Sequence, residues 1–180
     1  MKTREMVYAA LFAGIMAVLG LLPPIPMPLG VPITLQTFGV MLAGGLLGKR
    51  VGSISMLLFI LLVAIGLPVL SGGRGGIAIL FGPTGGYIFS WPIAAFLLGL
   101  FVERYWNKLR VTSLFVANIL IGIIVVYVFG IAYFVLVTDV GLLAAVLGNL
   151  IFIPGDLLKA FLAAWIVVRI KRTYPQLKLF

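Results

Sequence analysis

Asp156 and Lys159 are oppositely charged side chains, three residues apart, in a stretch that is otherwise almost entirely apolar. Residues at this spacing share one face of a helix. A carboxylate accepts hydrogen bonds and an ammonium donates them, so the pair could bind a ligand that offers N–H donors and a carbonyl or carboxylate acceptor. The alternative is a self-neutralising ion pair that only fixes the packing of its helix.

The composition indicates that this pair lies in lipid. The chain has 180 residues, of which 63% are hydrophobic and 9% are charged, and its mean hydropathy is +1.29. Soluble domains carry about 25% charged residues, so this chain has too few charges to cover a water-facing surface. A charged side chain inside a membrane is costly, usually faces the bundle interior, and marks a functional site by default.

The residue types that are missing exclude most enzyme chemistry. The chain has no cysteine and no histidine, which excludes thiolate nucleophiles, imidazole bases and Cys/His metal sites. Its four acidic residues are scattered: Glu5, Glu103, Asp139 and Asp156. We therefore assign no catalytic residue and no metal ligand, and we do not expect an enzyme.

Uncharged stretches predict the elements that position the Asp–Lys pair. A membrane-spanning helix needs about 20 predominantly apolar residues. We predict an all-α integral membrane protein with a single transmembrane domain over residues 1–180. Its six helices are expected at 6–22, 35–49, 51–69, 84–102, 112–137 and 142–170, the last one broken near Pro154.

The basic residues predict the orientation of this six-helix bundle. With six spans both termini lie on one side, and eleven of the thirteen basic residues fall on that side: Lys2, Arg4, Lys49, Arg50, Arg104, Lys108, Arg110, Arg169, Lys171, Arg172 and Lys178. The positive-inside rule then makes both termini cytoplasmic. Topology thus accounts for the net charge of +9, and we expect no nucleic-acid partner.

The outer side carries the longer connections. One is rich in proline and uncharged, over residues 23–34, and the other contains Arg74 between two glycine pairs. Such loops tend to cover something, although they could also simply plug one end of the bundle. Asp156 and Lys159 fall in the first turn that follows the break at Pro154, near the outer end of the last helix. We therefore expect a ligand site near the outer face.

Other candidate residues surround this expected site. Arg74 could clamp an anionic ligand, or it could face solvent or a lipid phosphate. The turn that contains Gly82 and Thr84 exposes backbone N–H groups, while Tyr87 and Trp91 offer flat apolar surface. Asn149 is a further polar candidate, though it could simply cap a helix break.

Small residues recur at a spacing of four in the first expected helix, at Ala9, Ala13 and Ala17. Small side chains let helices approach closely in lipid. The stripe therefore predicts either packing within the bundle or a docking surface for a second membrane protein. The chain has no ATP-binding motif, so active transport would take its energy from a partner or an ion gradient.

Four segments together resemble the biotin-specific BioY family, the substrate-binding (S) subunits of energy-coupling factor (ECF) transporters: 31–37, 72–76, 82–87 and 154–160. The resemblance extends over essentially the whole chain. It implies high-affinity biotin capture at the outer face of a bacterial or archaeal plasma membrane. It also implies a transmembrane coupling (T) subunit and two cytoplasmic ATPases as partners, with biotin as bound substrate and no cofactor.

The resemblance further implies roles for particular residues. Asp156 would accept the N–H groups of the biotin ureido ring, Lys159 would donate to its carbonyl, and Arg74 or Lys159 would bind its carboxylate. The substrate-binding candidates are Asp156, Lys159, Arg74, Tyr87, Thr84, Gly82, Gln36, Trp91 and Asn149, and the docking candidates are Ala9, Ala13 and Ala17. The alternatives are an S subunit for another vitamin or small metabolite and a ligand-free structural subunit.

Overall fold

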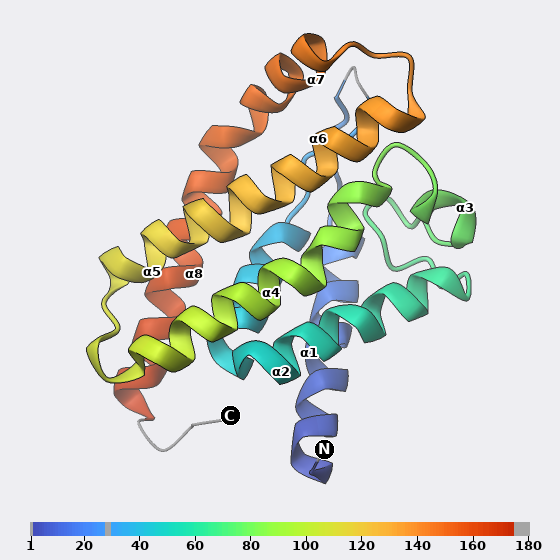
Figure 1. The fold of residues 1–180 in the computed structure, drawn as a ribbon. Coiled ribbons are helices and arrows are strands. Elements are labelled where there is room, and N and C mark those ends of the chain that lie inside the picture. Colours follow the sequence, from blue (N-terminus) through green and yellow to red (C-terminus); the bar gives the residue numbers. More distant parts are fainter. Residues whose placement is uncertain (1, 28–29, 175–180) are drawn as a thin grey trace.

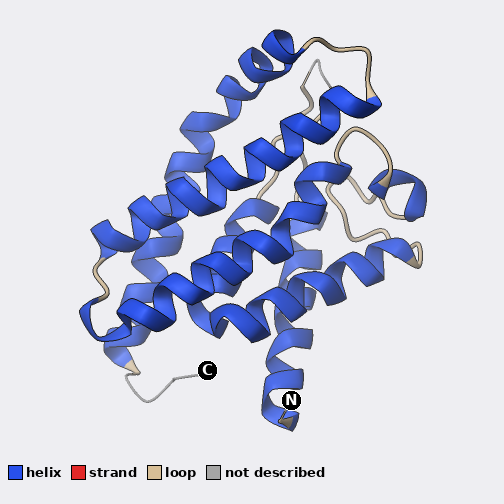
Figure 2. Cartoon of the chain, viewed as in Figure 1, coloured by secondary structure: helices blue, strands red, loops and turns tan. Residues whose placement is uncertain are grey.

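Helices make up nearly all of the regular structure in the computed structural model, which describes residues 2–27 and 30–174. Figure 2 shows these helices joined by loops, and the described residues contain no strand, only two isolated bridge pairs, Ile25–Ile33 and Leu70–Arg74. Lys178, one of the basic residues used to predict orientation, lies outside the described residues.

Figure 1 shows the order of the helical elements along the chain. They are α1 (Thr3–Leu21), α2 (Gln36–Ala64), α3 (Ile77–Leu80), α4 (Gly85–Tyr105), η1 (Trp106–Lys108), α5 (Val111–Ala117), η2 (Asn118–Val125), α6 (Val126–Val137), α7 (Leu142–Asn149), η3 (Leu150–Phe152) and α8 (Ile153–Thr173). The π-helical segment η2 connects α5 directly to α6, and η3 connects α7 to α8. These two runs are therefore continuous rods.

Within the described residues, five helical stretches are long and apolar enough to cross a membrane. They are Thr3–Leu21, Gln36–Ala64, Gly85–Lys108, Val111–Val137 and Leu142–Thr173. The difference from the six predicted helices lies in α2, which takes in both 35–49 and most of 51–69. The structure thus supports a membrane helical bundle, with the second and third predicted helices joined in one element.

A bend at Gly48 divides α2 into segments 36–47 and 49–64, which run in different directions (Figure 1). Gly48 has φ 75°, which is unfavourable for any residue with a Cβ. A Cβ on Gly99 of α4 would overlap the backbone of Gly48 and Lys49, so the close approach of α4 to the bend also requires glycine. The bend frees the N–H of Lys49, which donates to Glu103 Oε1 at 2.8 Å.

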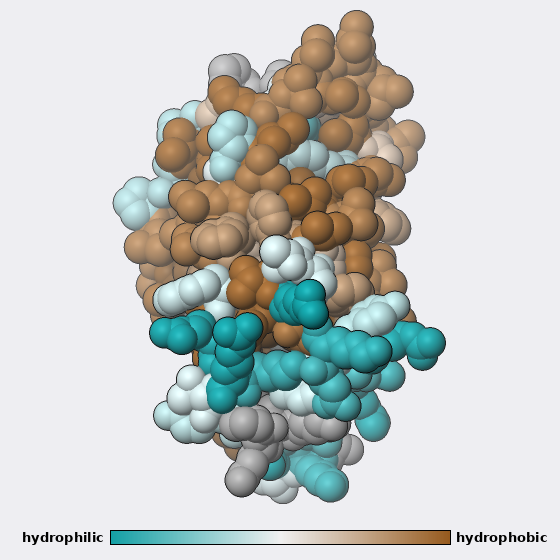
Figure 3. Space-filling view, turned by 90° about the vertical axis from the view of Figure 1, so that its left-hand side faces the viewer, coloured by the Kyte–Doolittle hydropathy of each residue, from teal (hydrophilic) through white to brown (hydrophobic). Residues whose placement is uncertain are grey.

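The core lies where α2 packs against α4, with α1, α6 and α8 around them. Met16, Leu47, Met56, Phe59 and Leu98 are fully buried there and in the adjoining layers. Large apolar side chains also cover the outside of the long helices. Figure 3 shows this apolar surface above a hydrophilic band, which is the pattern of a bundle that lipid surrounds.

The start of α1 and the end of α8 lie at the same end of the bundle (Figure 1). The described parts of the connection 22–35 (22–27 and 30–35), the segment 65–84 and the connection 138–141 lie at the opposite end. The first of these folds back on itself through paired backbone bonds, because Ile25 N donates to Ile33 O at 3.1 Å and Ile33 N donates to Ile25 O at 3.0 Å. This loop end of the bundle contains the candidate site.

Candidate functional site

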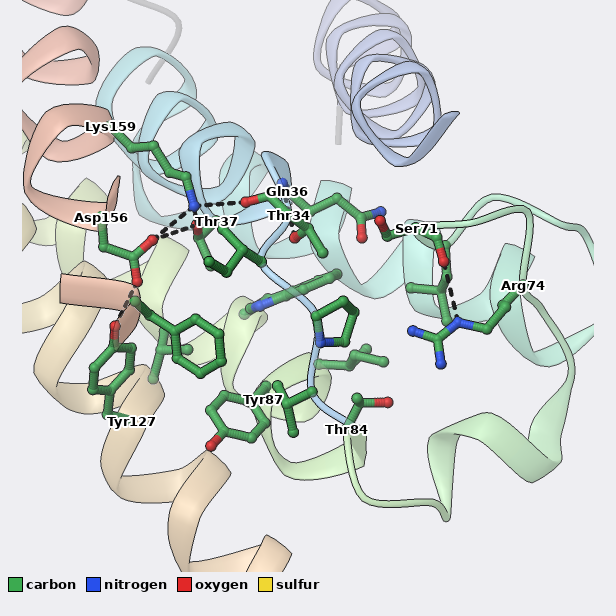
Figure 4. A pocket seen from close by; sticks show the side chains of 18 residues that line it. Thr34, Gln36, Thr37, Ser71, Arg74, Thr84, Tyr87, Tyr127, Asp156 and Lys159 are labelled. Atoms are coloured by element: carbon green, nitrogen blue, oxygen red, sulfur yellow. Dashed lines mark hydrogen bonds and ion pairs between the residues drawn. The ribbon is translucent and has the colours of Figure 1, made fainter. Parts of the chain in front are cut away.

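A cavity opens at the loop end, between the segment that leads into α2, the loop before α3, and helices α4, α6 and α8 (Figure 4). Apolar side chains make up most of its lining, with a few polar groups among them, as in sites that bind small ligands. Its lining residues are Val31, Pro32, Ile33, Thr34, Gln36, Thr37, Leu70, Ser71, Arg74, Thr84, Tyr87, Ile88, Trp91, Val126, Tyr127, Phe152, Asp156 and Lys159.

Asp156 and Lys159 form a buried ion pair at one end of the cavity. Lys159 Nζ lies 2.8 Å from Asp156 Oδ1, and the two side chains are 9% and 7% exposed. Asp156 stands in the first turn of α8, where the positive end of the helix dipole favours a carboxylate. The two charges are therefore in contact, as their spacing predicts. Because both side chains are buried, each charge is stabilised by the other in place of water.

All three N–H groups of the Lys159 ammonium have partners within the chain. Besides Asp156, Nζ donates to the backbone carbonyl of Thr34 at 2.6 Å and to Thr37 Oγ1 at 3.4 Å. An ammonium has three donors and no acceptor. A ligand acceptor that binds Lys159 must therefore replace one of these partners.

Asp156 also receives a hydrogen bond from a side chain that sequence reasoning did not select. Tyr127 of α6 donates its hydroxyl to Asp156 Oδ2 at 2.7 Å, and Thr37 Oγ1 donates to Oδ1 at 3.4 Å. A phenol inside an apolar helix was a signal available in the sequence. Several other tyrosines share that property, and only the packing of α5 and η2 against α8, which brings the start of α6 to Asp156, singles out Tyr127.

Arg74 lies across the cavity from the ion pair (Figure 4). Its backbone pairs with Leu70, at 2.9 and 3.2 Å, and its Nε donates to the carbonyl of Ser71 at 3.1 Å. No described residue accepts from its two Nη groups, and no described carboxylate lies within ion-pair distance of it. The guanidinium therefore keeps free donors and an uncompensated positive charge at this end.

Apolar rings form the wall between the two charged ends. Tyr87 and Trp91 of α4 are buried there, and Tyr87 donates its hydroxyl to Asn149 Oδ1 at 2.9 Å. Gln36 is also buried, with Nε2 bonded to the carbonyls of Met16 at 3.4 Å and Val69 at 3.2 Å. This amide joins the end of α1 to the loop after α2 and holds the cavity rim together.

Seven of the nine substrate-binding candidates line the cavity, and two do not. Gly82 lies in the turn before α4, where its N–H donates to the carbonyl of Ile79 at 3.1 Å. Asn149 supports Tyr87 from behind the wall. Sequence reasoning left out Thr34, Thr37 and Tyr127, although both threonines stand in the segment 31–37 that carried part of the resemblance.

The small residues of α1 divide between its inner and outer faces. Ala9 and Ala13 are 2% and 1% exposed and belong to the chain's own core, while Ala17 is half-buried. The small residues that α1 exposes are Ala10 and Gly14. The predicted stripe thus serves internal packing at Ala9 and Ala13, because the helix turns that face toward α2.

The arrangement is suited to binding. In the described part of the chain, no three histidine, cysteine, aspartate or glutamate side chains come together as metal ligands. The polar groups instead stand at the two ends of an apolar cavity, which suits a small molecule with a hydrogen-bonding head, an apolar body and an anionic tail.

Comparisons with known proteins agree with one another. The model of the BioY family matches residues 1–176. The biotin transporter BioY of Rhizobium etli is 48% identical over 183 residues, covering 98% of each chain. That of Rhodobacter capsulatus is 43% identical, covering 96% of this chain and 95% of the other. A crystal structure of the S-component for biotin from an ECF-type ABC transporter superposes with a TM-score of 0.88 at 38% identity, covering 96% of this chain and 95% of the other.

Proposed function

This chain belongs to the BioY family, and we propose that it is the biotin-binding S component of an ECF-type ABC transporter. It takes up biotin, and it is a transport subunit without enzymatic activity. The relatives are named as transporters, and the similar solved structure is an S component for biotin.

The observation that carries the proposal is the separation of charges across the cavity. Biotin has a ureido ring with two N–H donors and a carbonyl, an apolar bicycle and chain, and a carboxylate. The Asp156–Lys159 pair complements the ureido ring. The rings of Tyr87 and Trp91 complement the apolar bicycle and chain, and Arg74 complements the carboxylate.

Electrostatics supports one orientation of biotin over the other. Asp156 already neutralises Lys159, and its carboxylate would repel the carboxylate of the ligand. Arg74 has no counter-ion in the described chain and has free donors suited to a carboxylate. The ureido ring therefore binds beside Asp156, and the carboxylate binds at Arg74.

The test compares biotin with biotinamide, which keeps the ring and chain but lacks the negative charge. Affinities are measured by calorimetry on the purified full chain, with Arg74→Gln and, as a matched control, Arg110→Gln, whose side chain is exposed outside the cavity. A charge-assisted hydrogen bond contributes about 1.5–3 kcal/mol. The unmodified chain should thus prefer biotin by roughly 10- to 100-fold, and Arg74→Gln alone should remove this preference.

Two outcomes contradict different parts of the proposal. Absence of biotin binding in the unmodified chain contradicts the function. Biotin binding with an unchanged preference in Arg74→Gln contradicts only the orientation of the ligand.

In the proposed topology the chain crosses the membrane six times, with both termini in the cytoplasm. The two segments of α2, before and after Gly48, each make one of these crossings. The support for this topology is that most of the described basic residues stand at the start of α1, at the bend of α2, around the turn between α4 and α5, and near the end of α8, and these parts lie at the end opposite the cavity (Figure 1). The cavity then opens near the outer face, where biotin arrives.

The proposed partners are a transmembrane coupling subunit and two cytoplasmic ATPases, which would supply energy that this chain does not generate. The support is that the similar solved structure is the S-component of an ECF-type ABC transporter. The exposed face of α1 around Ala10 and Gly14 is proposed as the docking surface, because small side chains allow close helix contact.

A further inference from the structure

Tyr127 reaches the ion pair from a different helix. It lies in the first turn of α6, directly after η2, and its hydroxyl donates to Asp156 Oδ2 at 2.7 Å. Its ring meets the ring of Phe152 edge to face, with centroids 6.5 Å apart. Both rings line the cavity, so Tyr127 stands at the same surface that the ligand contacts.

The hydrogen bond from Tyr127 reduces the number of acceptor positions that the Asp156 carboxylate keeps free for a ligand. An ionised carboxylate has about four acceptor positions. Within the described chain, Lys159 and Thr37 occupy the two on Oδ1, at 2.8 and 3.4 Å, and Tyr127 occupies one on Oδ2. A single acceptor position remains, and it lies on Oδ2.

We propose that Tyr127 is a positioning residue that orients the Asp156 carboxylate so that Oδ2 presents one acceptor to one N–H of the ligand. Without the hydroxyl, Oδ2 has a second open acceptor and the carboxylate loses one of the contacts that fix its plane. This inference rests on the proposed function, since it assigns to Tyr127 a role in recognising the ureido ring.

A purely structural role for Tyr127 would consist of tying α6 to α8. Another bond already ties the same rod to α8, because Asn118 Nδ2 donates to the carbonyl of Ala160 at 2.9 Å in the buried interior. The edge-to-face contact with Phe152 also survives the loss of a hydroxyl. Tyr127→Phe should therefore keep the fold and change the carboxylate.

The experiment uses the purified full chain and compares Tyr127→Phe with Tyr133→Phe. Tyr133 is a matched control on the same helix, since its ring packs on Phe89 and its hydroxyl has no hydrogen bond in the described chain. We expect Tyr127→Phe to weaken biotin binding about tenfold, the worth of one charged hydrogen bond. We expect Tyr133→Phe to stay within about twofold of the unmodified chain, which is less than the contribution of one hydrogen bond, and we expect both variants to remain folded.

Infrared spectroscopy supplies a readout that a structural role would not move. The chain has only four acidic residues, so the carboxylate stretch of Asp156 can be assigned by its loss in Asp156→Asn. Loss of the Tyr127 hydroxyl should shift that band before any ligand is added. A shifted band together with weakened binding supports the positioning role.

Each contrary result has a distinct meaning. Unchanged affinity in Tyr127→Phe overturns the inference, and so does weakened affinity with an unshifted band, which indicates a structural role. Absence of biotin binding in the unmodified chain contradicts the proposed function, and the ligand-free spectra still show whether Tyr127 orients Asp156.

Discussion

The ammonium of Lys159 lies 2.6 Å from the backbone carbonyl oxygen of Thr34, which joins α8 to the segment that leads into α2. The same ammonium lies 2.8 Å from Asp156 Oδ1. Lys159 therefore holds both the carboxylate of the site and the rim of the cavity. A ligand carbonyl that binds Lys159 competes with a contact of the chain itself, so ligand recognition and the position of this segment are linked.

Lys159→Met should destabilise the chain and remove biotin binding. The substitution leaves Asp156 as a buried charge without its cation, which costs about 3–5 kcal/mol. The double variant Asp156→Asn/Lys159→Met removes both charges, so its melting temperature should recover most of the loss while binding stays absent. Thermal unfolding and calorimetry measure the two effects. Equal melting temperatures for the single and double variants would show that the charges are not coupled.

Gly99→Ala should destabilise the bundle by displacing α4 from the bend in α2. A Cβ at this position overlaps the backbone of Gly48 and Lys49, and backbone cannot move aside as a flexible side chain does. Overpacking costs about 1–3 kcal/mol. The matched control is Gly14→Ala on α1, where nothing lies within 4 Å of an added Cβ. Thermal unfolding should separate the two variants, and the idea fails if their melting temperatures coincide.

Single cysteines should report the orientation of the chain, because it has no native cysteine. Asp139→Cys lies at the loop end and Lys108→Cys lies at the opposite end, and both positions are exposed. In intact cells, a membrane-impermeant maleimide should label the first and should label the second only after lysis. The reverse pattern contradicts cytoplasmic termini, and labelling of both in intact cells contradicts a single orientation.

Substitutions on the two faces of α1 should separate docking from folding. Gly14→Leu adds bulk to an exposed position, so it should weaken co-purification with the coupling subunit and leave biotin affinity unchanged. Ala13→Leu adds the same bulk in the core, so it should lower the melting temperature. Undiminished co-purification of Gly14→Leu would exclude this face of α1 as the docking surface.

Several features of the molecule could be predicted from the sequence because they depend on composition or on local spacing. The low fraction of charged residues predicts a membrane bundle. A charge in an apolar stretch is conspicuous wherever it lies, so Asp156 and Lys159 could be selected without knowledge of the fold. Their contact follows from helical spacing alone, because both residues lie in the first two turns of one helix.

Other features depend on which helix surfaces contact one another, and the order of residues along the chain does not predict those contacts. A glycine with positive φ joins two predicted helices into α2, and glycine is too common in this chain for that bend to be read from residue type. Ala9 faces the core while Ala10 faces outward, since neighbouring positions on a helix point in different directions and only the packing against α2 selects the inner one.

The partners of the Asp–Lys pair show the same division. Thr34, Thr37 and Tyr127 come from segments that are distant from α8 in the sequence, and their hydroxyl and carbonyl groups resemble many others in the chain. Helical spacing within an apolar stretch is enough to predict that a carboxylate and an ammonium stand side by side in the bundle. The groups that form hydrogen bonds with these two charges become known only from the folded chain, because hydrogen bonds depend on distance in space and not on distance along the chain.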